Sequence, residues 1–254
     1  MNDYPPPYSS PPPQPPSRRV PVEPRAEKPT VVYGLMGVTI AVYLLQMLSQ
    51  WFLGADYPAA LGMKVNELIM RGELWRLFTP MFLHGSILHI GFNMYALYIL
   101  GPGMERYYGH TRFLGLYILA GFAGNVGSFL FASSPSLGSS TAIFGLLGAQ
   151  GVFVYRNRQV FGAMAQRVLM NIVLIAGVNL LIGLSPGIDN WGHVGGLIGG
   201  TLFAWYAGPL YRLEGGYFAP MVVDEHDDGD AVRTGLAVGA LFAILAGVKI
   251  YLGA

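Results

Sequence analysis

Seven long apolar segments constrain the fold of this chain more than any other sequence feature. A helix needs about 20 apolar residues to cross the hydrocarbon core of a bilayer, and each segment reaches or approaches that length. Only 11% of the residues are charged, whereas soluble domains carry about a quarter charged residues. The sequence therefore predicts an all-α, polytopic membrane helical bundle with spans at approximately residues 31–54, 80–101, 113–132, 137–155, 166–184, 190–208 and 232–252.

The Lys and Arg residues predict the orientation of the bundle. If the N-terminal end is cytoplasmic, eleven of the 15 Lys and Arg residues fall in cytoplasmic segments, and positive charge favours that side. The second, fourth and sixth spans then begin on the outer side, where the unusual polar residues of the spans also lie. We expect a multi-pass protein of the plasma membrane.

Residues 1–30 differ in composition from the rest of the chain. They hold most of the 18 prolines and few apolar residues, so we predict a disordered, proline-rich cytoplasmic tail and not a signal peptide. Such a tail is either solvated or bound by a partner that recognises polyproline, and the sequence names no partner. The remainder divides into a six-helix core (31–211), an acidic cytoplasmic linker (212–231) and a seventh transmembrane helix (232–254).

The first outer loop, from Ala55 to Pro80, mixes apolar and charged residues. This composition suits either an amphipathic segment in the membrane interface or an ordinary loop. The pair Trp75-Arg76 near its end is either a membrane anchor or an Arg that binds loop carbonyls and stiffens the segment.

The segment from Leu137 to Ala149 places hydroxyl groups at the start of a span. Gly138 permits a tight turn, and Ser139 and Ser140 follow where backbone N–H groups lack intrahelical partners and can hold negative charge. We interpret Ser140 as a nucleophile; the alternative is a helix cap. Phe144, one turn further, is placed to stack on an imidazole.

His193 begins the sixth predicted span, directly before a run of glycines. Gly196 and Gly200 are four residues apart and form a small-residue seam that lets two helices approach closely. A close approach of the fourth span would bring Ser140 within hydrogen-bonding distance of His193. We therefore predict that His193 is the general base, the alternative being a structural hydrogen-bond donor.

The second predicted span carries His84, His89 and Asn93. His89 and Asn93 are four residues apart and share a helix face, whereas His84 is turned away from that face. As donors in a water-poor cavity, His89 and Asn93 suit an oxyanion; the alternative is interhelical polar contact. We expect no metal site, because the chain has no HExxH pattern and the spans contain no acidic residue.

Together these residues resemble the rhomboid family of intramembrane serine proteases. The resemblance covers about Val31 to Tyr211, plus one C-terminal span as in six-plus-one members. Thr141 departs from the family pattern, in which glycine more commonly follows the serine. The matching segments are Gly138-Ser139-Ser140 with AIFGLLGA shortly after it, HGSILHIGFN from His84, GHVGGLIGG from Gly192, and Trp75-Arg76.

The resemblance implies an intramembrane serine endopeptidase that uses a Ser–His dyad without an acid and needs no cofactor. Ser140 would be the nucleophile and His193 the general base. The Ser140 backbone, His89 and Asn93 would form the oxyanion pocket, and His84 would be an accessory pocket residue.

The resemblance also implies the partners, which are the lipid bilayer and single-span transmembrane proteins cleaved near the outer membrane face. The fifth predicted span, near Val168 to Leu184, and the loop from Ser185 to Asn190 would form a lateral gate and a cap. The formal net charge of +1 suggests no nucleic-acid partner. The absence of Cys excludes a Cys nucleophile and thiolate metal sites.

Two alternative functions fit the same spans. A non-proteolytic rhomboid-like protein that binds membrane clients would share the fold, and Thr141 is the residue that favours it. A transporter would need ion-coupling groups, but the spans hold no acidic residue and no internal repeat is evident. The protease is the predicted function because both the nucleophile and the base are present.

Overall fold

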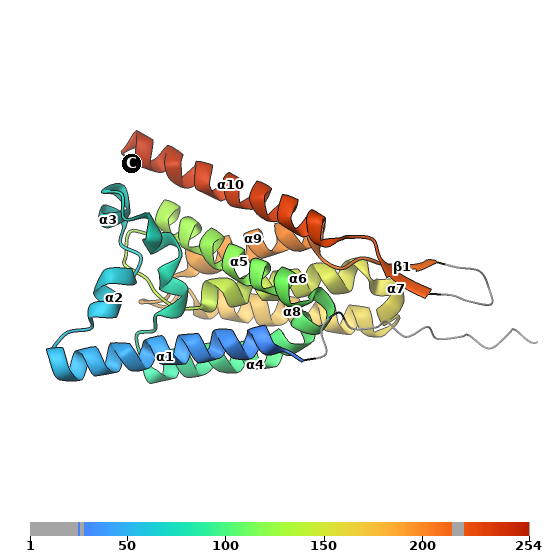
Figure 1. Cartoon of the computed structure of the whole chain (residues 1–254), viewed down its shortest axis with the longest axis horizontal. Coiled ribbons are helices and arrows are strands. Elements are labelled where there is room, and N and C mark those ends of the chain that lie inside the picture. The colour runs from blue at the N-terminus through green and yellow to red at the C-terminus, as the bar shows by residue number, and fades with distance from the viewer. Residues whose placement is uncertain (1–24, 26–27, 215–220, 254) are drawn as a thin grey trace, which may run out of the picture.

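The computed structural model describes residue 25, residues 28–214 and residues 221–253. Long helices run side by side, with the short helices α2 and α3 at one end and a small hairpin at the other (Figure 1). The predicted tail, residues 1–30, lies almost wholly outside the described residues. The elements are α1 (Thr30–Leu53), α2 (Tyr57–Gly62), α3 (Asn66–Met70), the 3-10 helices η1 (Leu74–Leu77) and η2 (Thr79–Phe82), α4 (Ile87–Tyr108), α5 (His110–Phe131), α6 (Ser140–Arg156), α7 (Arg158–Phe161), α8 (Met164–Ile182), α9 (Asn190–Ala207), β1 (Tyr211–Glu214), β2 (Met221–Asp224) and α10 (Asp228–Leu252).

Each of the seven predicted spans corresponds to one long helix, namely α1, α4, α5, α6, α8, α9 and α10. Four helices of the described residues, α1, α5, α8 and α10, are long and apolar enough to cross a membrane by length and composition. The helix α6 has only 17 residues, and most of them are buried. Neighbouring helices therefore cover α6 in place of lipid. Apart from the hairpin, the chain is an all-α, multi-pass membrane bundle, as predicted.

The predicted start of the second span, at residue 80, is wrong by about two turns. Thr79–Phe82 forms η2, and α4 begins only at Ile87. The Ser86 side chain caps α4 by accepting the backbone N–H of His89 at 3.2 Å, which satisfies one of the orphan donors of the first turn. His84 therefore precedes the helix and does not lie on it, contrary to the sequence prediction.

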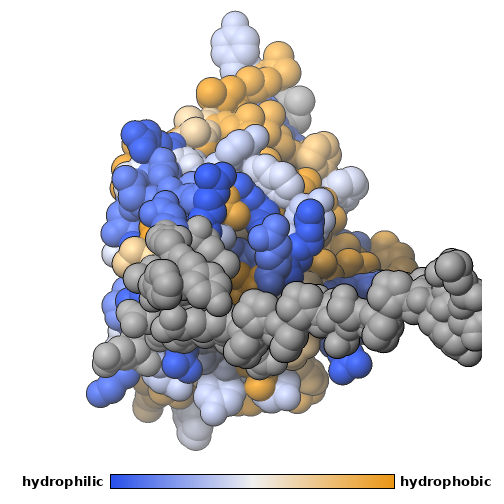
Figure 2. All heavy atoms as spheres, turned by 90° about the vertical axis from the view of Figure 1, so that its right-hand side faces the viewer, coloured by the Kyte–Doolittle hydropathy of each residue, from blue (hydrophilic) through white to orange (hydrophobic). Residues whose placement is uncertain are grey.

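The acidic linker predicted over 212–231 contains regular structure among its described residues. The strands β1 and β2 pair antiparallel, with Tyr211 opposite Asp224, and α10 already begins at Asp228 behind an acidic capping box. The buried guanidinium of Arg112 in α5 pairs with Asp224 at 2.9 Å and fixes the hairpin to the bundle. Hydrophilic residues gather over the middle of this end of the molecule (Figure 2).

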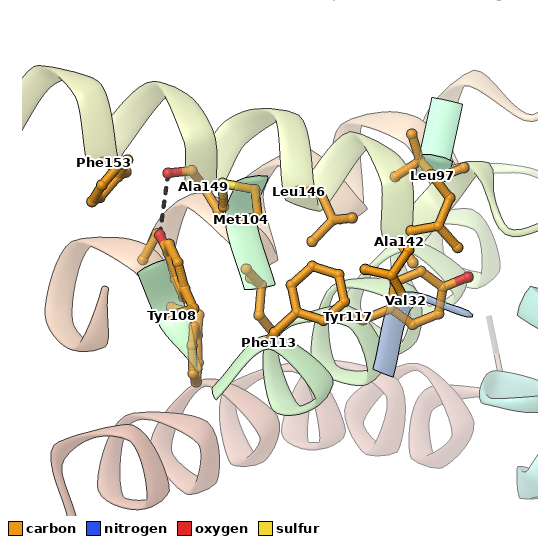
Figure 3. Close-up of a cluster of buried hydrophobic side chains, with 14 of the residues drawn as sticks. Val32, Leu97, Met104, Tyr108, Phe113, Tyr117, Ala142, Leu146, Ala149 and Phe153 are labelled. Atoms are coloured by element: carbon orange, nitrogen blue, oxygen red, sulfur yellow. Dashed lines mark hydrogen bonds between the residues drawn. The ribbon is translucent and has the colours of Figure 1, made fainter. Parts of the chain in front are cut away.

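A buried hydrophobic cluster joins α1, α4, α5 and α6 (Figure 3). Val32, Leu97 and Leu146 are fully buried in it. The hydroxyl of Tyr108 donates to the carbonyl oxygen of Ala149 at 3.3 Å, so this buried hydroxyl of the cluster is satisfied. Because lipid is as apolar as these side chains, close van der Waals packing is what stabilises the contact.

Glycines bring the backbones of α6 and α9 into direct contact. A Cβ atom at Gly196 would lie 2.0 Å from the carbonyl oxygen of Thr141, and one at Gly200 would lie 2.2 Å from that of Gly145. A Cβ at Gly145 would lie 2.1 Å from the Cβ of Ala120 in α5 and 3.0 Å from the carbonyl oxygen of Gly196 in α9. The three helices can approach this closely only without side chains at these positions.

The first outer loop is held by its own hydrogen bonds. The guanidinium of Arg76 is buried and donates to the carbonyl oxygens of Met63 and Ala60 at 2.8 and 2.9 Å. Of the two roles considered for this Arg, the structure supports stiffening of the loop. The indole N–H of Trp75, a half-exposed side chain, donates to the carbonyl oxygen of Leu61 at 3.0 Å.

The outer faces of α1 and α8 are apolar and exposed. Only 6% of the apolar stretch of α8 is buried within the chain, and 22% of that of α1. Exposed apolar surface of this extent suits lipid contact. Large side chains on the outer face of α8 include Met170, Val173, Leu174 and Leu181.

Candidate active site

The site begins with the turn that leads into α6. Gly138 has a φ of 133°, a conformation that side chains strongly disfavour, and its N–H donates to the carbonyl oxygen of Pro80 at 2.9 Å. The chain turns sharply there, so that Ser139 is the N-cap and Ser140 the first residue of α6. The Ser140 hydroxyl therefore lies beside the N–H groups of the first turn.

The helix α9 places His193 against this hydroxyl. The Nε2 atom of His193 lies 3.0 Å from the Oγ of Ser140, a normal hydrogen-bond distance. The imidazole stacks on Phe144, with ring centroids 4.2 Å apart and planes inclined by 9°. The glycine contacts of α6 and α9 begin within one turn of this pair, so the seam sets the separation of hydroxyl and imidazole.

The imidazole of His89 lies against the turn that precedes Ser140. A Cβ atom at Gly138 would lie 2.7 Å from both the Cε1 and the Nε2 of His89, so the imidazole packs directly on the glycine. The side-chain amide of Asn93 is buried and donates to the carbonyl oxygen of His89 at 3.0 Å. His89 belongs to the cavity wall, whereas Asn93 lies behind it.

His84 occupies the loop between η2 and α4 and faces away from the cavity. Its Nε2 lies 3.3 Å from the hydroxyl of Ser139 and 3.5 Å from the N–H of the same residue. Burial, with a smaller effect of nearby His89, lowers the pKa of His84 to about 4. A neutral His84 thus supports the turn before Ser140 and does not line the cavity.

A cavity of about 610 Å³ opens beside the Ser140–His193 pair. Its wall includes these two residues, His89, residues 134–137 before α6, residues 187–189 before α9, and residues 190–191 in the first turn of α9. Serine hydroxyls and backbone groups alternate with apolar side chains in this wall.

The loop before α6 is anchored from the first outer loop. The ammonium group of Lys64 donates to the carbonyl oxygens of Ala132 and Ser134 at 2.8 and 3.0 Å. The backbones of Lys64 and Ser136 also exchange two hydrogen bonds. Burial lowers the pKa of Lys64 to about 8, so at neutral pH the group remains a charged donor.

Thr141, the departure from the expected family pattern, is accommodated by glycines on two neighbouring helices. A Cβ at Gly124 in α5 would lie 2.5 Å from the Thr141 Cβ, and a Cβ at Gly192 in α9 would lie 3.1 Å from its Cγ2. The side chain is buried in a space that these glycines leave open, and Thr141 lies within α6 without disturbing it.

Sequence reasoning missed one acidic residue of the cavity wall, Asp189. It is the N-cap of α9, and its Oδ1 accepts the N–H of Gly192 at 2.9 Å. The predicted span begins at Asn190, one residue later, which left this carboxylate outside the site. The N-cap preference for Asp just before an apolar helix was the available signal.

Within the described residues, no group of three His, Asp or Glu side chains is placed to hold a metal ion.

Comparison with known proteins places these segments in a family. A family model described as the Rhomboid domain matches residues 71–210. Rhomboid protease GluP of Bacillus subtilis (strain 168) is 42% identical over 178 residues, which are 70% of this chain and 34% of that protein. RHOMBOID-like protein 9, chloroplastic, of Arabidopsis thaliana is 35% identical over 160 residues, 63% of this chain and 37% of that protein.

A third relative is Rhomboid-like protease 1 of Toxoplasma gondii, 36% identical over 170 residues, which are 63% of this chain and 52% of that protein. The matched part of the chain spans about a third of the length of the first two relatives.

Proposed function

Because this chain belongs to the rhomboid family, we propose that it is an intramembrane serine endopeptidase whose catalytic pair is Ser140 and His193. The observation that carries the proposal is the 3.0 Å separation of the Ser140 Oγ from the His193 Nε2 in the wall of an open cavity. Relatives named as proteases in Bacillus subtilis and Toxoplasma gondii support the same reaction class.

The proposed reaction is acyl transfer in two steps. The Oγ of Ser140 attacks the carbonyl carbon of a peptide bond while the Nε2 of His193 takes its proton. His193 then gives this proton to the departing amine, which leaves an acyl-enzyme. A water molecule from the cavity, deprotonated by the same Nε2, hydrolyses the ester and restores the Ser140 hydroxyl. Phe144, stacked on the imidazole, limits its rotation between these steps.

We assign the oxyanion pocket to the N–H groups at the start of α6 together with His89. Donors fixed in advance around a developing negative charge are the largest source of rate enhancement in acyl transfer. The His89 ring is positioned for this role because it rests on Gly138, two residues before the nucleophile. Asn93 would contribute by fixing the first turns of α4 at His89, through its bond to the His89 carbonyl.

The proposed substrates are single-span membrane proteins that enter from the lipid. The exposed apolar helix α8 is followed by the connection 183–189 to α9, and residues 187–189 of this connection line the cavity. A substrate helix must open its backbone hydrogen bonds to be cleaved, and this is feasible only where the site supplies water. We place the cavity at the outer face of the plasma membrane and the N-terminal tail in the cytoplasm, as the distribution of Lys and Arg predicts.

Labelling with a fluorophosphonate probe tests the proposal. The folded protein in detergent is expected to form a covalent adduct at Ser140, because only a hydroxyl with an adjacent base reacts readily. The heat-denatured protein and the Ser140→Ala variant are the controls, and neither should react. A folded protein that takes up no label would contradict the proposal and favour a client-binding rhomboid-like protein.

The Gly138→Ala variant is expected to slow both probe labelling and substrate cleavage by at least about tenfold, since small displacements of catalytic groups are costly. The added Cβ would displace His89 and strain the turn before Ser140. Gly72→Ala is the matched control, because Gly72 also has a positive φ but has open space around the position of a Cβ. Equal rates for the two variants would show that contact with His89 is unimportant.

A further inference from the structure

Three buried polar atoms at the start of α9 lack hydrogen-bond partners among the described residues. They are the Oδ1 of Asn190, the Nδ1 of His193 and the Oδ2 of Asp189, and the last two belong to residues one helical turn apart. Leaving a buried polar atom unsatisfied costs about 1–3 kcal/mol. Two such atoms in one cavity wall therefore call for an explanation.

The chemistry of the two atoms is complementary. For the Nε2 of His193 to accept the Ser140 proton, the neutral imidazole must carry its hydrogen on Nδ1. The Nδ1–H group is then a hydrogen-bond donor without an acceptor, and the Oδ2 of Asp189 is an acceptor without a donor. Asp189 precedes His193 by one helical turn, and the turn is closed by the backbone bond from the His193 N–H to the Asp189 carbonyl at 3.2 Å. Side chains at this spacing share a helix face.

We propose that Asp189 is a positioning residue for His193, whose Oδ2 accepts the Nδ1 hydrogen across one water molecule of the cavity. The carboxylate thereby holds the imidazole in the tautomer that serves Ser140 and stabilises the imidazolium formed during attack. This inference rests on the proposed protease function and adds an acid to what the resemblance implies is a dyad.

The two carboxylate oxygens of Asp189 have different roles in this proposal. Oδ1 caps α9 by accepting the Gly192 N–H at 2.9 Å, which leaves Oδ2 available to the imidazole. The carboxylate also lies close enough to Lys64 to raise the pKa of that amine against the larger effect of burial. Its charge therefore acts inside the cavity region, between the loops that frame the nucleophile.

The Asp189→Asn variant tests the inference, because Asn caps a helix as well as Asp does but carries no charge. With a fluorogenic single-span substrate in vesicles, we expect kcat to fall by about tenfold or more. KM and the melting temperature should stay near their wild-type values. Asp189→Glu, which keeps the carboxylate, should recover part of the lost kcat.

Wild-type kcat in Asp189→Asn would overturn the inference. A parallel loss of kcat and melting temperature in Asp189→Asn and Asp189→Glu alike would also overturn it, because it would show a capping role only. If Asp189→Asn fails to fold, Asp189→Ser supplies a second capping residue without charge. Wild-type protein that is no more active than Ser140→Ala would instead refute the protease function itself.

Discussion

Ser140→Ala and His193→Ala are each expected to reduce the rate of substrate cleavage by at least about a thousandfold, with the melting temperature nearly unchanged. The two side chains act on one proton across the 3.0 Å contact between Oγ and Nε2. Loss of either one removes the whole step, so the double variant should be no slower than the single variants. Cleavage of a model single-span protein in reconstituted vesicles measures all three rates.

Ser139→Ala is the matched control for the pair. Its hydroxyl is the neighbour of Ser140 in the chain, but it faces the neutral His84 at 3.3 Å and lies outside the cavity. We expect the cleavage rate to fall only a few-fold, because the turn before α6 would lose the contact between the Ser139 hydroxyl and His84. If the cleavage rate fell equally in Ser139→Ala and Ser140→Ala, the assignment of Ser140 as the nucleophile would be contradicted.

Gly196→Ala is expected to destabilise the protein by about 3 kcal/mol and to abolish cleavage, because overpacking a tight contact costs roughly 1–3 kcal/mol and sometimes more. The new Cβ would lie 2.0 Å from the carbonyl oxygen of Thr141. That atom belongs to the backbone next to Ser140, so α6 must move as a whole and take the nucleophile away from His193. Thermal unfolding in detergent and cleavage in vesicles measure the two effects.

Two helical glycines provide the matched controls for this variant. A Cβ at Gly91 in α4 or at Gly247 in α10 would meet nothing within 4 Å. In an open position, Gly to Ala favours a helix by about 1 kcal/mol, so Gly91→Ala and Gly247→Ala should be as stable as the wild type or more stable. If Gly196→Ala behaved as they do, the α6–α9 contact would not control the site.

The sequence predicted the number and order of the long helices because the apolar segments are long and separated by polar breaks. It failed at the start of α4, where η2 and the Ser86 cap replace the helical turn that hydrophobicity suggests. Hydrophobicity records which residues avoid water, but caps and short 3-10 turns depend on individual hydrogen bonds. The same error placed His84 on a helix, although it supports the turn before Ser140.

The candidate site was predictable in part, since Ser140 and His193 each precede a run of small residues that allows close contact. The contact between them is present in the structure, and their catalytic roles remain predictions. Two details of the site could be learned only from the structure. The amide of Asn93 bonds to a helix carbonyl behind the cavity wall, and Asp189 lies in the wall as the N-cap of α9, one residue before both the helix and the predicted span.

Thr141, Gly124 and Gly192 occupy one common volume at the meeting point of three helices. A residue larger than glycine fits at position 141 because the other two positions are glycines. In related sequences we therefore expect a larger side chain at one of these three positions to occur with smaller side chains at the other two. The effect of a substitution at one position on stability should then depend on the residues at the other two. The threonine beside Ser140 is thus accommodated by the absence of side chains on the two helices that pack against it.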